Sequence, residues 1–349
     1  MIIGAAIVFG ALAALIVNWG NPPNMGICLA CFMRDIAGAL GLHRAGVVQY
    51  LRPEIFGILL GAFITSIGFR EFKPMGGSSP LVRFILGALF VIAALVFLGC
   101  TTRAWLRLAG GDLNAITGIT GLVVGIIVGI FFLRRGFNLG KASKMPALVG
   151  WIMPVLMVGL LLLAIFTPGF IFASESGPGA MFAPLAVSIV IGLVIGFLAQ
   201  RTRMCFAGGI RDLIITRDTY LFSGVAAFFV AALVTNYIAG NFGADGIYHW
   251  GFADQPIAHN DHLWNFLSMA LAGLTVTMLG GCPLRQTVLA GEGSADAGVT
   301  VLGMLVGAAF AHNFLLASSP AGTGTWGPVA VVVGLVFCVV IGFLMRERV

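Results

Sequence analysis

The amino-acid sequence predicts an all-α polytopic membrane protein, and three observations carry this prediction. Hydrophobic residues make up 59% of the 349 residues and charged residues only 9%, whereas soluble domains have about 25% charged residues. Glycine occurs 49 times, and small residues let membrane helices approach closely. Apolar stretches of about 20 residues, the length that crosses a bilayer, recur along the chain. The composition excludes a soluble enzyme, a nucleic-acid-binding protein and a disordered chain.

About ten apolar segments are expected to be transmembrane helices. They cover residues 1–18, 54–70, 80–98, 112–133, 146–166, 181–200, 219–240, 263–281, 295–317 and 327–345. We expect the first segment to be a span and not a cleaved targeting peptide, because no basic region precedes it and no small-residue cleavage site follows it.

The charges in the loops predict the orientation of these spans. Residues 134–144 hold four basic residues and no acidic one, so the positive-inside rule places this loop in the cytoplasm. The 241–262 loop holds three aspartates and no Lys or Arg, and is expected outside. Both termini are then cytoplasmic. Arg34, Arg44 and Arg52 are exceptions that would lie outside, where we expect them to line an entrance for an anion.

Two short motifs occur twice, in the same order. CLACFMRD at 28–35 matches CFAGGIRD at 205–212, and LGCTTR at 98–103 matches GGCPLR at 280–285. The cysteines of the two motifs are separated by similar lengths of chain in both cases. Because two ordered matches are improbable by chance, the sequence predicts a duplicated half, as in many transporters.

The repeat divides the chain into four parts. Residues 1–145 form the first repeat, 146–180 a linking transmembrane helix and loop, 181–320 the second repeat, and 321–349 a C-terminal transmembrane helix. With four spans in each repeat and one linking helix, equivalent spans run in opposite directions. The sequence therefore predicts two inverted repeats around an axis in the membrane plane.

Each repeated cysteine follows a helix-breaking stretch and begins a segment too short to span the membrane. Thr101 follows Cys100 and Pro283 follows Cys282, and both residue types are favoured where helices begin. We therefore expect four half-helices, re-entrant from the two sides, whose cysteine ends meet near the midplane. Helix N-termini offer free N–H groups and partial positive charge, which suit an anion.

The candidate site consists of thiols and charges in register on these half-helices. The substrate pathway is predicted to include Cys28, Cys31, Cys100, Cys205, Cys282, Arg34, Arg103, Arg211, Arg285, Asp35 and Asp212. Charged residues inside a membrane usually serve function, although the Arg–Asp pairs could instead be salt bridges that clamp the half-helices. We expect no catalytic residue, metal or cofactor. His249, His259 and His262 have no zinc-site spacing and are assigned to a surface loop, and Cys338 to packing.

The repeat with CFAGGIRD and GGCPLRQ resembles the YeeE/YedE family of sulphur-compound transporters. The stretch NPPNMGICLACFMRD is similar to the branch associated with selenium. The resemblance implies an hourglass-like protein of the bacterial inner membrane that is not an enzyme. It also implies that Cys28, Cys100, Cys205 and Cys282 pass thiosulfate by weak S–H contacts. Cys31 is an additional thiol. The implied partners are a small sulphur or selenium anion, membrane lipid and a soluble sulphur or selenium carrier protein, without nucleic acid.

The favoured function is a transporter or channel that takes up a thiosulfate-like anion through a pore of thiols and half-helix N-termini. Thiols are weak donors, so a series of them can admit an anion and still release it. Cys100 and Cys282 occupy equivalent places and are expected to approach each other as the narrowest pair. Two alternatives remain: a membrane thiol-disulfide oxidoreductase that uses Cys28 and Cys31, and a subunit that hands chalcogen to a soluble carrier.

Overall fold

The computed structural model describes residues 1–243 and 246–346. Asp245, one of the three aspartates counted in the 241–262 loop, lies outside the described residues. The prediction of an all-α membrane protein is confirmed, because helices account for nearly all the regular structure. The described chain also has two short strands, β1 (Met75–Gly76) and β2 (Ser143–Lys144), which pair antiparallel.

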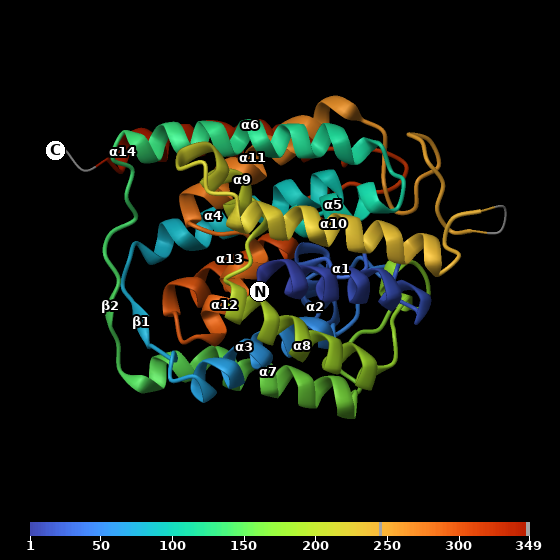
Figure 1. Cartoon of the computed structure of the whole chain (residues 1–349), viewed down its shortest axis with the longest axis horizontal. Coiled ribbons are helices and arrows are strands. Elements are labelled where there is room, and N and C mark those ends of the chain that lie inside the picture. Colours follow the sequence, from blue (N-terminus) through green and yellow to red (C-terminus); the bar gives the residue numbers. More distant parts are fainter. Residues whose placement is uncertain (244–245, 347–349) are drawn as a thin grey trace.

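Ten long helices follow the ten expected spans (Figure 1). Among the described residues, eight helical stretches are long and apolar enough to cross a membrane, while α1 and α3 are apolar but shorter. The chain is thus a multi-pass membrane protein. The long helices are α1 (Ile2–Asn18), α3 (Pro53–Gly68), α4 (Pro80–Phe97), α6 (Asn114–Arg134), α7 (Ala147–Phe166), α8 (Leu185–Thr202), α10 (Tyr220–Ile238), α11 (His262–Leu279), α13 (Ala295–Asn313) and α14 (Gly327–Leu344).

Four short α-helices lie between the long ones, and one 3-10 turn covers Pro178–Ala180. The four α-helices are α2 (Leu29–Ala39), α5 (Thr101–Ala109), α9 (Phe206–Ile215) and α12 (Pro283–Gly291). With 9 to 11 residues each, they are too short to cross a bilayer. One repeated cysteine is the N-cap residue of each: Cys28, Cys100, Cys205 and Cys282. The predicted cysteine-capped half-helices are therefore present in both halves.

The long helices make their closest contacts between the halves. α1 packs against α10 and α3 against α8, while α6 packs against α11 and α13 against α4. Glycines permit these approaches: a side chain at Gly125 would overlap the Ala270 carbonyl, and one at Gly303 the Phe84 carbonyl. In the order of the helices, α4 and α6 of the first half correspond to α11 and α13 of the second. Exchanging the halves therefore converts the α6–α11 contact into the α13–α4 contact. This is the pattern that a pseudo-two-fold axis produces.

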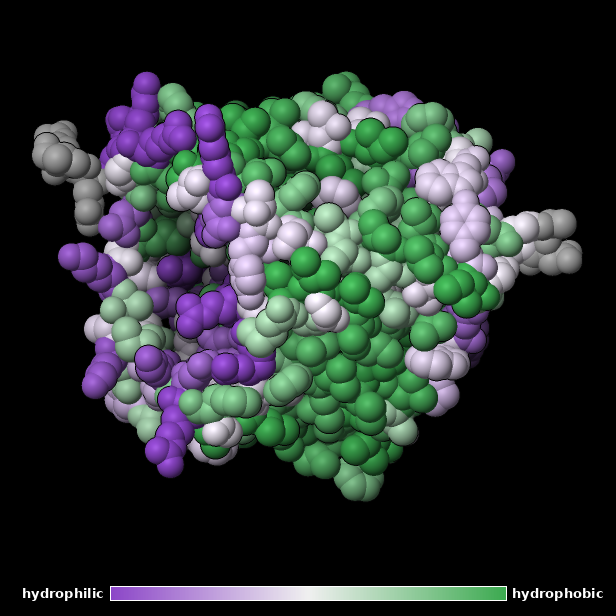
Figure 2. Space-filling view, viewed as in Figure 1, coloured by the Kyte–Doolittle hydropathy of each residue, from purple (hydrophilic) through white to green (hydrophobic). Residues whose placement is uncertain are grey.

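The two ends of the molecule differ in charge. Figure 2 shows a wide apolar band beside a strongly hydrophilic end. That end, called here the basic face, carries β1, β2 and the segments 69–79, 135–146 and 216–219 (Figure 1). The opposite face carries the loop 239–261, called here the outer loop. Apolar side chains of α7 such as Ile152 and Val155 are exposed on the band, where lipid would cover them.

Candidate functional site

The first cysteine of each repeat, Cys28 or Cys205, places its sulfur atom over the first turn of a half-helix. The Cys28 Sγ accepts a hydrogen bond from the Cys31 N–H at 3.4 Å. In the second half, the Cys205 Sγ accepts one from the Gly208 N–H at 3.2 Å. Both cap residues have extended backbone, as N-caps do. The sequence repeat thus reproduces one local geometry, in which a sulfur lies at the positive end of a helix dipole.

The sulfur contacts run within each half of the chain. Cys28 Sγ lies 3.7 Å from Cys100 Sγ, and the Cys282 N–H donates to Cys205 Sγ at 3.3 Å. All four cysteines are buried and free of disulfides. Among the described residues, no hydrogen bond joins Cys100 to Cys282, and their approach as the narrowest pair stays a prediction. The N-caps of the two half-helices in one half of the chain lie next to each other. Cys28 therefore contacts Cys100, and Cys205 contacts Cys282.

Arg103 joins three segments around the first-half cysteines. Its Nη1 lies 3.1 Å from Cys31 Sγ, its Nε donates to the Asn24 carbonyl at 2.8 Å, and its Nη2 donates to the Ile257 carbonyl at 2.8 Å. The side chain is fully buried. Arg103 therefore places a cation beside the second thiol of the CxxC and holds the outer loop over it.

The outer loop, on the face opposite the basic face, covers the cysteines of the first half. The Asn24 N–H donates to the Tyr248 hydroxyl at 3.0 Å, and the Leu113 N–H donates to the Gly251 carbonyl at 3.0 Å. His259 Nε2 lies 2.8 Å from the Val96 carbonyl, and burial lowers the pKa of this imidazole. His259 is thus a buried anchor, and assigning it to the surface was wrong. The sequence of a polar loop does not indicate whether a histidine side chain in it is buried or exposed.

The arginines expected to line an entrance form a buried cluster instead. Asp35 accepts hydrogen bonds from Arg34 Nε at 2.9 Å and from Arg52 Nε at 2.8 Å. Arg52 also donates to the carbonyls of Pro178 and Met181. The Asp35 carboxylate pairs with both guanidinium groups, so the buried cluster keeps one net positive charge, and the two carbonyls stabilise the Arg52 side of it. This cluster ties α2 to the loop after α7. Arg44 is exposed, with its guanidinium over the Phe172 ring.

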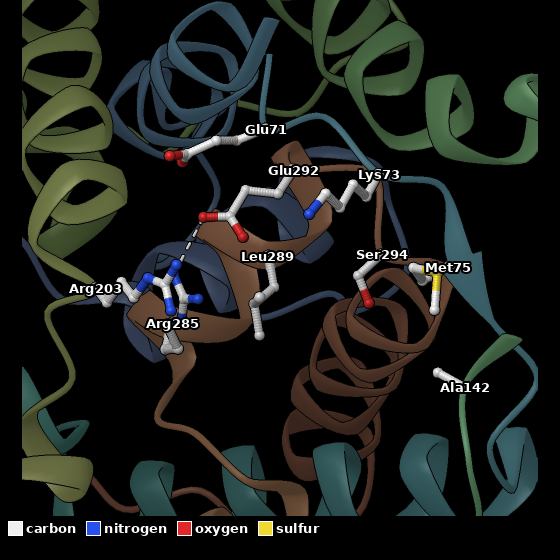
Figure 3. Close-up of a pocket in the computed structure, with 9 residues that line it drawn as sticks. All are labelled: Glu71, Lys73, Met75, Ala142, Arg203, Arg285, Leu289, Glu292 and Ser294. Carbon is white, nitrogen blue, oxygen red and sulfur yellow. Dashed lines mark hydrogen bonds and ion pairs between the residues drawn. The ribbon is translucent and has the colours of Figure 1, made fainter. Parts of the chain in front are cut away.

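The matching charges of the second half face the basic end. Arg211 Nε lies 2.8 Å from Asp212 Oδ1, and both side chains are 27% exposed. Arg285, the counterpart of Arg103, is paired with Glu292 at 3.2 Å. It lines a cavity of about 480 Å³ that follows α12 (Figure 3). The lining residues are Glu71, Lys73, Met75, Ala142, Arg203, Arg285, Leu289, Glu292 and Ser294.

Sequence reasoning missed most of this cavity. Lys73 and Arg203 were not among the predicted site residues, since nothing local in the sequence links residues from separate loops. The structure also assembles no obvious metal site: in the described part of the chain, no three His, Cys, Asp or Glu side chains are grouped as ligands.

These features define a multi-pass membrane protein with thiols buried at paired half-helices, a type of protein suited to moving a solute. The sulphur transport family matches residues 201–346 of the chain. The thiosulfate transporter TsuA of Escherichia coli (strain K12) is 29% identical over 124 residues, which are 32% of this chain and 30% of that protein. The chain thus spans about 30% of that relative's length. The predicted resemblance to the YeeE/YedE sulphur transporters is confirmed, and the family match lies in the second half of the chain.

The family match contains part of the candidate site. Cys205, Arg211, Asp212, Cys282 and Arg285 lie inside residues 201–346. The first-half cysteines lie outside this range. Their assignment to a substrate pathway depends on the internal repeat and the geometry described above.

Proposed function

We propose that the protein transports a thiosulfate-like sulphur anion along a path lined by cysteine thiols and half-helix N-termini. The observation that most supports this proposal is the repeated cap geometry. The sulfur atoms of Cys28 and Cys205 each accept a hydrogen bond from the backbone N–H of the third residue of their half-helix. A doubly charged anion is costly to dehydrate. Helix N-termini compensate part of that cost, and thiols add weak contacts that allow release.

The path is proposed to run between the two faces through both sulfur pairs. It would pass the Cys28–Cys100 pair beneath the outer loop, then the Cys205–Cys282 pair, and leave through the cavity at Arg285. The division into inverted repeats at 1–145 and 181–320 belongs to this proposal. The location in a bacterial inner membrane is also part of the proposal. The excess of basic residues on the basic face supports a cytoplasmic position for that face and for both termini.

A second candidate function is thiol-disulfide exchange, and one observation favours it. Cys28 Sγ lies 3.7 Å from the Cys100 thiol and accepts the backbone N–H of Cys31, the second cysteine of the CxxC, at 3.4 Å. A Cys31→Ser variant separates the functions. Transport by weak donors should retain most uptake, whereas exchange through the CxxC should be abolished. Delivery to a soluble carrier is a third candidate, to be tested by requiring that carrier for uptake.

The decisive experiment measures labelled thiosulfate uptake in cells that lack their own importer. Cys100→Ala and Cys282→Ala each remove a thiol from a buried pair, leaving the anion short of about 1–3 kcal/mol of hydrogen bonding. If that step limits transport, uptake falls about 5- to 150-fold. Cys338→Ala is the matched control, because this cysteine is buried in α14 away from the pairs. Full uptake by both variants at normal protein levels would refute the thiol path, and parallel selenium-compound uptake would distinguish the chalcogen.

A further inference from the structure

The cavity on the basic face has more positive than negative charge available to a ligand. Glu71 is already engaged, with Arg201 at 3.1 Å and the Gln200 amide at 2.7 Å. Within residues 1–243 and 246–346, neither Lys73 nor Arg203 forms an ion pair with a carboxylate, and both side chains are exposed. Two cations are therefore unneutralised in the cavity, which matches the charge of a divalent oxyanion.

The third cation of the cavity has a carboxylate partner that could be displaced. Arg285 and Glu292 meet at 3.2 Å, and their side chains are only 16% and 19% exposed. The Lys73 N–H donates to the Glu292 carbonyl at 3.0 Å, which fixes the backbone of Glu292 at the rim. Figure 3 shows the Arg203 and Glu292 side chains directed toward Arg285. An anion that reached Arg285 would compete with the Glu292 carboxylate.

We propose that this cavity is a binding station for a divalent sulphur oxyanion, held by Lys73, Arg203 and Arg285, and that Glu292 is an internal counter-anion which the ligand displaces from Arg285. The inference rests on the proposed function and adds a site to the path. The volume of about 480 Å³ admits such an anion with part of its water shell, since a water molecule takes about 30 Å³.

Displacement of Glu292 couples anion binding to proton binding. Burial raises the pKa of the Glu292 carboxyl, and Arg285 opposes that rise. The groups that face it are Arg285 on α12, Arg203 after α8, and Glu71 and Lys73 after α3. When an anion takes Arg285 from it, Glu292 loses its main stabilising charge and binds a proton more readily. Anion affinity should therefore rise as the pH falls through the pKa of Glu292.

The test measures sulfate and thiosulfate binding to the purified full-length protein by calorimetry between pH 5 and pH 8. Glu292→Gln removes the competitor, so binding at pH 8 should strengthen about fivefold and its pH dependence should flatten. Arg203→Gln should weaken binding by a similar factor. Arg217→Gln is the matched control, since Arg217 is an exposed arginine of the basic face outside the cavity. Thermal unfolding checks that each variant is folded.

The outcomes separate this inference from the proposed function. Unchanged affinity in Arg203→Gln, or an unaltered pH profile in Glu292→Gln, would overturn the binding station even if thiosulfate uptake were normal. Altered binding in these variants of a protein that imports no thiosulfate would support the station and refute the proposed transport function. An equal change in Arg217→Gln would show that general surface charge, and not the cavity, governs binding.

Discussion

The two halves share the cysteine geometry but differ in what surrounds it. In the first half, Arg103 is fully buried and satisfied by Cys31 and two carbonyls. In the second, its counterpart Arg285 is 16% exposed beside a cavity and paired with Glu292. The loop after α3 covers residues 69–79, whereas the equivalent outer loop covers 239–261. The two halves thus share the placement of the cap sulfurs, while loops of unequal length leave the first-half arginine enclosed and its second-half counterpart beside a cavity.

The largest expected difference concerns the Arg–Asp motif. Asp35 is completely buried against Arg34 and Arg52, and removing one partner of a buried ion pair costs about 3–5 kcal/mol. Asp212 is 27% exposed, where ion pairs contribute about 0–1 kcal/mol. Asp35→Asn should therefore sharply lower the thermal stability and yield of folded protein, and Asp212→Asn should barely change them. Equal losses would show that the second-half pair is also a clamp.

The next comparison uses the two equivalent arginines. Arg103→Leu leaves the buried Asn24 carbonyl and the half-buried Ile257 carbonyl without this donor, so it should reduce stability by about 2–3 kcal/mol. Arg285→Leu should leave folding nearly intact and lower thiosulfate uptake. Folded protein is measured by thermal unfolding, and uptake is normalised to it. A folded Arg103→Leu protein with low uptake would instead assign Arg103 to the anion path.

The sequence predicted those features that depend on local patterns. Ten spans follow from apolar length, and the four caps follow from cysteines that precede a Thr, a Pro or a repeated motif. The pairing of Cys28 with Cys100 was not predictable in this way, since it joins residues 72 positions apart. The burial of Arg34 and Arg52 was also missed. An arginine near a membrane face gives the same sequence signal in an open entrance as in a buried cluster, and only Asp35 and the distant 178–181 segment decide between them.

The smallest expected effect tests the closure of the first half. The buried Tyr248 hydroxyl accepts the Asn24 N–H at 3.0 Å, and losing it in Tyr248→Phe costs about 1 kcal/mol. Tyr237→Phe is the matched control, because its hydroxyl accepts an exposed hydrogen bond from Trp250 Nε1. If the outer loop seals the first-half thiols, a loosened loop opens more often. Labelling of Cys31 and Cys100 by a small neutral thiol reagent should then be about fivefold faster in Tyr248→Phe and unchanged in Tyr237→Phe.

Cys205, the N-cap residue of α9 in the second half, supplies an internal reference in the same sample. If its labelling rises as much as that of Cys31, the substitution has loosened the whole protein. If neither rises, the outer loop is not the barrier that distinguishes the two halves.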